Sequence, residues 1–262
     1  MDHSPDREQS RVTRTNYQAR TEGDALVRAR SAWSEGRLAE AARMLERLLT
    51  THPDRADALH LRGIVALNSG KLSDAQDYLR RAVAISPDNA DYRCDLGTVY
   101  HAQQLRREAE AAYLDALRIA PGQDNALFNL GNVLREQMRS AAAFQCYTKL
   151  LDRAPTFPAW NNMGLALIDM GHSAEARHCF EQALRKDPQD IQARANLALA
   201  QQEAGQLHAS EQTLRQALAI APKEADLHLN LGNVLLAHGS TDAALQSLRH
   251  AVQLAPTHSA AH

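Results

Sequence analysis

The segment LRRAVAISP (79–87) recurs along the chain as YLDALRIAP (113–121), FEQALRKDP (180–188), LRQALAIAP (214–222) and LRHAVQLAP (248–256). Each copy is an amphipathic run that ends in proline. Proline has no backbone N–H and disfavours helical geometry in the residue before it. Each run is therefore predicted to be a helix that stops at its proline.

The prolines that end these runs belong to a longer series with a nearly constant spacing. Successive members are 34, 34, 34, 33, 34 and 34 residues apart. The series is Pro53, Pro87, Pro121, Pro155, Pro188, Pro222 and Pro256. A period of this length indicates a solenoid of helix-turn-helix units, in which stacked neighbours bury a continuous core.

Other columns align when the proline is placed at position 32 of a 34-residue unit. Position 8 is always Gly or Ala, and position 20 is Ala or Ser. Position 27 is Ala or Leu, and position 24 is a larger apolar residue. The members of position 24 are Leu45, Leu79, Tyr113, Tyr147, Phe180, Leu214 and Leu248. Small residues allow two helices to approach closely where they cross, and the larger residue fills the space beside them.

This pattern resembles the tetratricopeptide repeat, whose motif has small residues at positions 8, 20 and 27 and Pro at 32. The resemblance implies an all-α fold, a right-handed α-solenoid (superhelix) of seven tandem repeats. The expected repeats are 22–55, 56–89, 90–123, 124–156, 157–190, 191–224 and 225–258. Residues 1–21 are expected to be a flexible leader or capping segment, and 259–262 the start of a truncated eighth repeat. We expect one elongated domain with no internal linker.

Two irregularities interrupt the repeat. Five repeats have Gly at position 15, where the first helix ends, but the third and fourth have Gln104 and Met138. We expect those two turns to differ slightly in geometry. The fourth repeat is also one residue short, and Pro158 follows Pro155 closely. Either a local change in superhelical pitch or merely a tighter loop would accommodate the missing residue.

Composition limits the classes of function. Apolar residues make up 44% of the 262 residues, and the formal net charge is −2. The sequence has no basic face that would indicate nucleic-acid binding, and it has no apolar run long enough to span a membrane. Cys94, Cys146 and Cys179 are too scattered for a disulfide framework and are expected to be free thiols. The predicted location is cytoplasmic.

The candidate site lies on one stripe of the first helix of each repeat. Positions 2, 5, 6, 9, 12 and 13 fall on the side opposite the positions that face the second helix. Position 6 is Asn in four consecutive repeats: Asn129, Asn162, Asn196 and Asn230. We see no structural need for Asn there, because it is a mediocre helix former. Its amide both donates and accepts hydrogen bonds, so a row of Asn suits the main chain of a peptide.

The Asn row resembles the asparagine ladder inside the tetratricopeptide superhelix of O-linked N-acetylglucosamine transferases, which grips the substrate backbone. In this family the stripe lines the concave surface. The alternative is that these Asn residues only solvate that surface or reflect recent duplication of the repeat. The residues expected to bind a peptide are Asn129, Asn132, Asn162, Asn196, Asn230, Asn233, Phe128, Asn161, Leu165 and Leu199.

Other sites are argued against. The carboxylate clamp of chaperone-binding tetratricopeptide domains needs Lys at position 5, which is absent from all seven repeats. The sequence has no phosphate-binding glycine loop, no HExxH motif and no nucleophile elbow. We therefore expect no catalytic residues, no cofactor and no metal site.

The predicted function is binding of an extended or helical polypeptide in the concave groove. One alternative is the substrate-recruiting part of a larger enzyme, most simply a protein O-glycosyltransferase with its catalytic domain beyond residue 262. Another is a scaffold that forms homo-oligomers through an uncapped C-terminal end. There, no following helix is expected to cover the outward-facing part of Leu245, Leu248, Val252 and Leu254.

Overall fold

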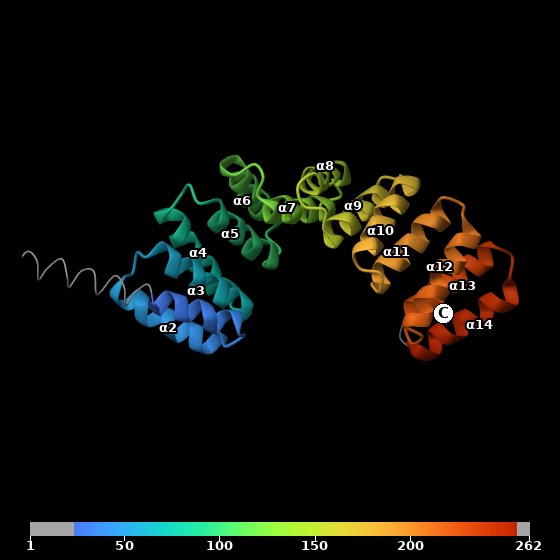
Figure 1. Ribbon diagram of the computed structural model, residues 1–262, viewed down its shortest axis with the longest axis horizontal. Helices are drawn as coiled ribbons and strands as arrows, with labels where there is room; N and C mark the ends of the chain where they lie inside the picture. Colours follow the sequence, from blue (N-terminus) through green and yellow to red (C-terminus); the bar gives the residue numbers. More distant parts are fainter. Residues whose placement is uncertain (1–23, 256–262) are drawn as a thin grey trace, which may run out of the picture. The chain divides into compact units, whose positions relative to one another are not determined.

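The computed structural model describes residues 24–255, and within that range every regular element is an α-helix (Figure 1). The first helix covers residues 24–34. The others are α2 (Leu38–Thr51), α3 (Ala56–Asn68), α4 (Leu72–Ile85), α5 (Ala90–Ala102), α6 (Arg106–Ile119), α7 (Asp124–Glu136), α8 (Ser140–Leu151), α9 (Phe157–Asp169), α10 (Ser173–Lys186), α11 (Ile191–Glu203), α12 (Leu207–Ile220), α13 (Ala225–Ala237) and α14 (Thr241–Leu254). They alternate as the first and second helices of a 34-residue period. This is an all-α repeat solenoid, as predicted.

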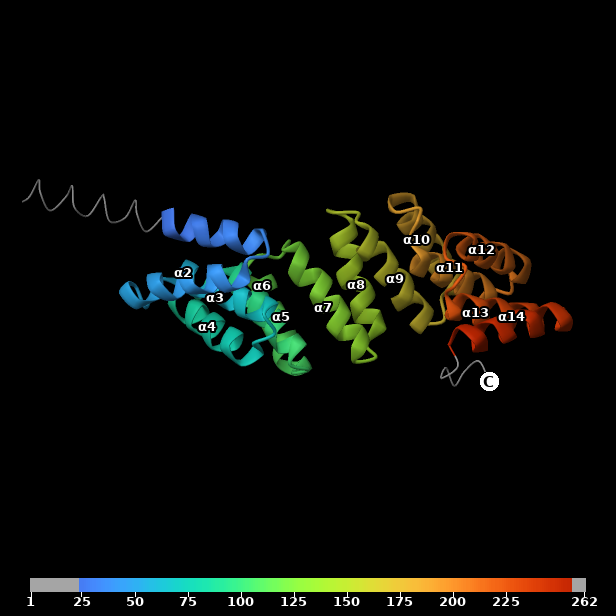
Figure 2. The same ribbon diagram turned by 90° about the horizontal axis from the view of Figure 1, so that it is seen from below.

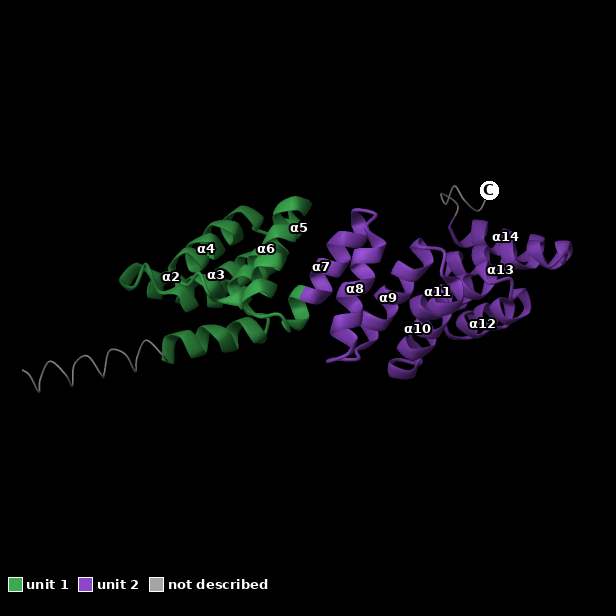
Figure 3. Ribbon diagram, turned by 90° about the horizontal axis from the view of Figure 1, so that it is seen from above, with its two compact units in different colours: residues 1–126 green, residues 127–262 purple. Residues whose placement is uncertain are grey.

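The chain divides into two compact units, residues 1–126 and 127–262, and the division falls inside α7 (Figure 3). Within unit 1, α3 packs on α4 and α5 on α6, and α4 also packs on α5. Within unit 2 the same pattern joins α9 to α10, α11 to α12 and α13 to α14, with α10 on α11 and α12 on α13. Figure 2 shows the pairs α3–α4 and α13–α14 side by side. The right-handed course of the whole superhelix stays a prediction.

The small residue at position 8 is required by the packing inside each helix pair. A methyl group added to Gly131 would lie 2.6 Å from the ring of Tyr147, and one added to Gly97 would lie 2.7 Å from the ring of Tyr113. Gly164 stands in the same relation to Phe180. The large residue at position 24 therefore lies directly on the backbone of the preceding helix, and any Cβ at position 8 would displace it.

The turn between the two helices of a repeat has one geometry throughout. In the first repeat, N–H of Gly36 bonds to the carbonyl of Trp33, and N–H of Arg37 bonds to that of Ala32. This pair of bonds is the Schellman motif, in which one residue adopts the left-handed conformation. All five Gly residues at position 15 have φ between 73° and 83°.

Gln104 and Met138 do not change this turn, so the expected difference in geometry is wrong. Their φ angles are 63° and 61°, in the same left-handed region as the glycines. The Schellman hydrogen bonds are kept as well, from Leu105 to Tyr100 and from Arg139 to Leu134. The hydrogen-bonded turn thus imposes a conformation that costs an ordinary residue about 1–2 kcal/mol.

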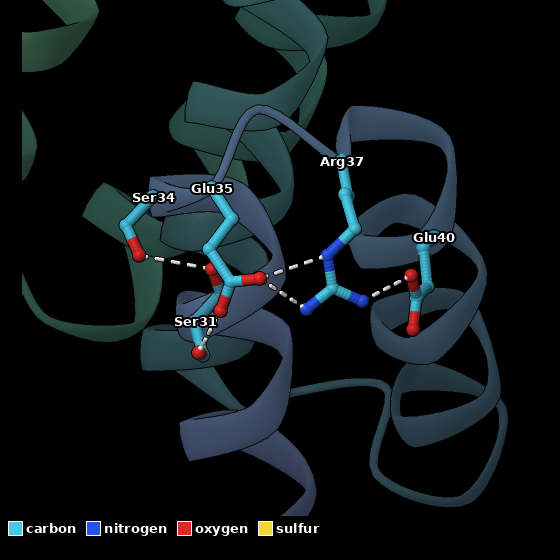
Figure 4. Close-up of polar contacts among 5 residues, drawn as sticks. All are labelled: Ser31, Ser34, Glu35, Arg37 and Glu40. Atoms are coloured by element: carbon cyan, nitrogen blue, oxygen red, sulfur yellow. Dashed lines mark hydrogen bonds and ion pairs between the residues drawn. The ribbon is translucent and has the colours of Figure 1, made fainter.

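Charged side chains brace the first of these turns (Figure 4). The guanidinium of Arg37 lies between the carboxylates of Glu35 and Glu40, and the Ser31 hydroxyl donates to Glu35 at 2.7 Å. The bond from Ser31 and the bond from Arg37 lower the pKa of Glu35. These groups are exposed to solvent, so their contribution is mainly to hold the turn locally.

The missing residue of the fourth repeat is taken from a helix. Helix α8 has 12 residues, whereas α2, α4, α6, α10, α12 and α14 have 14. The loop after α8 runs over 152–156, one residue longer than the loop 86–89 between α4 and α5. The expectation of a tighter loop is therefore wrong. Pro158 lies in the first turn of α9, where the missing N–H costs nothing.

Some predictions lie outside the described range. These are the leader or capping segment at 1–21 and the start of an eighth repeat at 259–262. Within the range, the three cysteines are free thiols, with Cys94 and Cys179 buried. No helix between residues 24 and 255 combines the length and apolar character that crossing a bilayer requires.

Candidate functional site

Neighbouring first helices come into contact along the predicted stripe. In unit 2, α9 contacts α11, and α11 contacts α13; in unit 1, α3 contacts α5. The side chains at positions 5, 6 and 9 of successive repeats can therefore reach one another. This is the geometric basis of the candidate site.

Four of the predicted Asn residues form one continuous chain of hydrogen bonds in unit 2. Nδ2 of Asn196 donates to Oδ1 of Asn161 at 3.1 Å, and Nδ2 of Asn161 donates to Oδ1 of Asn162 at 3.2 Å. Nδ2 of Asn162 then donates to Oδ1 of Asn132 at 2.8 Å. At the other end, Nε2 of Gln192 donates to Oδ1 of Asn196 at 3.4 Å. We call these five residues the amide row.

The amide row has a direction. From Gln192 and Asn196 on α11, through α9, to Asn132 on α7, each amide donates to the next one along. Each internal member uses its carbonyl as acceptor and its NH₂ as donor, so neither group is left without a partner. The free protein therefore keeps its amides ordered before any ligand arrives.

Burial explains why amides are needed here. Asn196 is only 8% exposed, and Asn132, Asn161 and Asn162 are half-buried. A buried polar group without a partner costs about 1–3 kcal/mol, so side chains that both donate and accept are favoured in a continuous row. The expectation that Asn has no structural role at position 6 is thus wrong for Asn196.

The remaining predicted residues are less closely joined. Phe128 lies on the ring of Tyr147, with 6.3 Å between centroids, and Leu165 packs against the core near Phe180. Leu199 is 40% exposed, which leaves an apolar surface one turn from Asn196. Asn129 and Asn230 are half-buried, and Asn233 is exposed.

Tyr147 is the residue that sequence reasoning missed. Its place at position 24 predicts a core residue, and its side chain is indeed fully buried. Its hydroxyl, however, donates to Oδ1 of Asn132 at 2.7 Å, so it contacts the amide row from α8. Burial raises the pKa of Tyr147, which keeps the hydroxyl protonated and a donor. The signal in the sequence was a hydroxyl at a core position, which requires a partner.

Unit 1 has a different pair at the equivalent positions. Nε2 of His60, at position 5, lies 2.6 Å from Oδ2 of Asp95, at position 6 of the next repeat. The His60 ring stacks on Tyr92 with 4.4 Å between centroids. Position 6 one repeat earlier is Leu61, which is buried. The amide chemistry is thus a property of unit 2.

A separate apolar pocket lies among α8, α9 and α10. Its volume is about 580 Å³. Its lining consists of Phe144, Met163, Leu167, Met170, His172, Ala174, Glu175, His178 and Cys179. Across residues 24–255, no three His, Cys, Asp or Glu side chains gather in a group that could hold a metal ion.

The sequence and the fold were compared with those of known proteins. The model of the tetratricopeptide repeat matches residues 26–90, 94–157, 161–225 and 195–259. No curated protein matches the sequence.

Several solved structures share the fold at low identity. YrrB, described as a TPR protein with an unusual peptide-binding site, is 19% identical with a TM-score of 0.62, covering 70% of this chain and 95% of its own. The C-terminal part of a TPR repeat-containing protein from Cytophaga hutchinsonii is 14% identical with a TM-score of 0.73, covering 90% and 97%. PilF from Pseudomonas aeruginosa is 22% identical with a TM-score of 0.67, covering 79% and 94%. The sequence match and the shared fold together show that this chain belongs to the tetratricopeptide repeat family.

Proposed function

We propose that the first-helix stripe of unit 2 binds an extended polypeptide and reads its main chain through the amide row. Tetratricopeptide repeats are in general protein-interaction modules, and one structural neighbour is described as having a peptide-binding site. The observation that carries the proposal is the unbroken hydrogen-bond chain from Gln192 to Asn132.

The chemistry of the row fits a peptide backbone. A backbone amide has one N–H donor and one carbonyl acceptor, and each Asn side chain that would meet it has two N–H donors and a carbonyl oxygen with two lone pairs. Exchanging an amide–amide bond within the row for an amide–backbone bond replaces one neutral hydrogen bond by another of similar strength. Because the row is already ordered, little conformational entropy is lost on binding.

Apolar side chains beside the row supply contact area. Leu199 is 40% exposed, and Leu165 and Phe128 are half-buried next to the amides. In an extended peptide, alternate side chains point toward the protein. These residues would therefore contact every second side chain of the ligand, while the amides contact its backbone.

Fluorescence anisotropy tests the proposal with a labelled 15-residue peptide of Ser, Thr and Val and two shuffled versions. β-Branched residues favour the extended backbone that the row would read. The three peptides are expected to bind with similar affinity. The variant Asn132→Ala/Asn162→Ala should bind about 10-fold more weakly or worse, since each lost hydrogen bond contributes about 0.5–1.5 kcal/mol.

Asn68→Ala is the matched control, because Asn68 is exposed at the end of α3 in unit 1. Its affinity should equal that of the wild type. Equal affinity of the wild type and the double variant would contradict the proposal, as would failure of all three peptides to bind at millimolar concentration.

A second candidate function is self-association, as a scaffold. Leu245 and Leu254 on α14 are 45% and 41% exposed, which is an apolar surface suited to a second copy of the chain. Sedimentation velocity over a hundredfold range of concentration should then show a dimer that Leu245→Glu/Leu254→Glu disrupts. A monomer at all concentrations would exclude it.

A further inference from the structure

Tyr147 and Asn162 both donate to the same atom, Oδ1 of Asn132, at 2.7 Å and 2.8 Å. Two donors on one carbonyl orient the Asn132 amide, because a flipped amide would set its NH₂ against the NH₂ of Asn162 and would leave the buried hydroxyl hydrogen of Tyr147 without its acceptor. The Tyr147 ring cannot move away easily, since it is fully buried and lies on the backbone of Gly131. One hydroxyl on α8 thus contributes to how an amide on α7 is turned.

The orientation of the carbonyl also fixes the direction of the NH₂ group of Asn132. With the carbonyl turned toward Tyr147 and Asn162, the NH₂ of Asn132 is turned away from them, and the side chain is half-exposed. Within residues 24–255, no acceptor takes its Nδ2 hydrogens. Asn132 therefore ends the amide row with a donor directed at solvent.

We infer that Tyr147 is a positioning residue, which sets the polarity of the amide row so that Asn132 offers a hydrogen-bond donor to a main-chain carbonyl of the ligand. The inference rests on the proposed peptide-binding function. It adds a specificity: at this end of the row the ligand must present an acceptor, which every peptide bond does and a lone N–H donor does not.

The pairing of positions 24 and 9 within this chain supports the inference. The Tyr113 hydroxyl of the third repeat donates to Oγ1 of Thr98 at 3.3 Å, as Tyr147 does to Asn132. Where position 24 has no hydroxyl, position 9 of the same repeat is apolar in three of five cases, and the other two are Leu45 with Arg30 and Leu248 with Asn233. The three apolar pairs are Leu79 with Ile64, Phe180 with Leu165 and Leu214 with Leu199. In both repeats with Tyr at position 24, position 9 is polar and accepts a hydrogen bond from that hydroxyl.

The first test is Tyr147→Phe, which removes the hydroxyl and keeps the ring over Gly131. The Ser/Thr/Val peptide should bind about 3- to 10-fold more weakly, as expected for a misdirected hydrogen bond. Tyr113→Phe is the matched control, since it removes the same hydroxyl from an equivalent ring in unit 1. Its peptide affinity should not change. Far-UV circular dichroism establishes that both variants fold.

The second test is Asn132→Asp, which keeps the acceptor for Tyr147 and Asn162 but removes the outward donor. Affinity should fall at least as far as in Tyr147→Phe, although the internal bonds remain. If Asn132→Asp binds like the wild type, the outward donor is not used, and the inference is wrong.

If Asn132→Ala/Asn162→Ala binds weakly while Tyr147→Phe binds normally, the inference fails and the proposed function stands. If neither variant loses affinity, the proposed function fails.

A spectroscopic measurement separates positioning from general stabilisation. In the ligand-free protein, the side-chain NH₂ signals of Asn132 in ¹H–¹⁵N spectra should shift or double in Tyr147→Phe, because its amide can then turn. The side-chain signals of Asn68 should stay in place in the same variant. Unchanged Asn132 signals in Tyr147→Phe would show that Asn162 alone fixes the amide, which would overturn the role given to Tyr147.

Discussion

In unit 1, His60 meets Asp95; in unit 2, Asn161 meets Asn196, and the two pairs occupy the same positions of the repeat. The backbone frame brings position 5 of one repeat to position 6 of the next in both units. The side chains that meet there are free to differ. In unit 1 the Asp95 carboxylate has only acceptor atoms, so it cannot donate a hydrogen bond to a further residue. In unit 2 the amides both donate and accept, so the contact extends into a row.

The difference shows that the helix-packing frame and the side chains of the stripe are encoded separately. Positions 8, 20 and 24 are fixed by helix packing and are alike in both units. Positions 5, 6 and 9 carry the chemistry and can change from repeat to repeat without changing the fold. We expect substitutions in the helix-packing frame to have equal effects in the two units, and substitutions in the stripe to have different effects.

The largest expected effect is on the buried thiols, one in each unit. Burial raises the pKa of Cys94 and of Cys179 to about 12. At pH 8 only about one in 10⁴ of such thiols is ionised, so Ellman's reagent should modify them more than about 1000-fold more slowly than in urea. Cys146 is half-buried and should react first. Fast reaction of Cys94 with slow reaction of Cys179 would show that the core of unit 1 is looser.

These thiols also give a pH dependence. Their pKa is higher in the folded than in the unfolded protein, where it is about 8.5. Their contribution to stability is therefore complete below about pH 8.5 and is lost as the pH rises toward the folded value. The free energy of unfolding of Cys94→Ala/Cys179→Ala, measured by urea titration, should fall less steeply above pH 9 than that of the wild type.

The next effect compares the helix packing. Gly97→Ala and Gly131→Ala each place a methyl group against a buried Tyr ring, at 2.7 Å and 2.6 Å. Overpacking of this kind costs about 1–3 kcal/mol, and the cost should be the same in both units. Urea unfolding followed by circular dichroism measures it. A clear difference between the two variants in the loss of unfolding free energy would show that the helix packing differs between the two units.

The stripe should behave differently from the frame. Asn196→Ala removes a buried amide and leaves Oδ1 of Asn161 without its donor, which should cost about 1–2 kcal/mol. Asp95→Ala removes the partly exposed partner of His60 and should cost about 0–1 kcal/mol. Urea titration again measures both. A greater loss in Asp95→Ala would mean that the stripe of unit 1 is the more important for stability.

The smallest effect concerns the left-handed turns. Met138→Gly and Gln104→Gly relieve a strained backbone and should stabilise the protein by about 0.5–1 kcal/mol each, after the added entropy of glycine in the unfolded chain. Met138 is 85% exposed, so its side chain contributes little packing. Gly171→Met is the reverse control and should destabilise. Lower thermal stability of Met138→Gly would show that the turn is not strained.

The sequence predicted the frame well because its period repeats seven times, and each column averages over many residues. The same columns indicated which positions of successive first helices meet. It did not predict the direction of the amide row, because that depends on which atoms of Asn161, Asn162 and Asn196 come together across two helices. Position 24 predicts only a large core residue, so it does not single out the hydroxyl of Tyr147. The turns at Gln104 and Met138 were judged by residue type, whereas their hydrogen bonds decide the conformation.

The most direct test of the central claim follows the side-chain NH₂ signals of all asparagines while the Ser/Thr/Val peptide is added to the ¹⁵N-labelled protein. We predict that Asn132, Asn161, Asn162 and Asn196 shift together and saturate at the dissociation constant found by anisotropy, while Asn68 and Asn89 in unit 1 stay in place. Binding of the peptide with the amide-row signals unmoved would contradict the account.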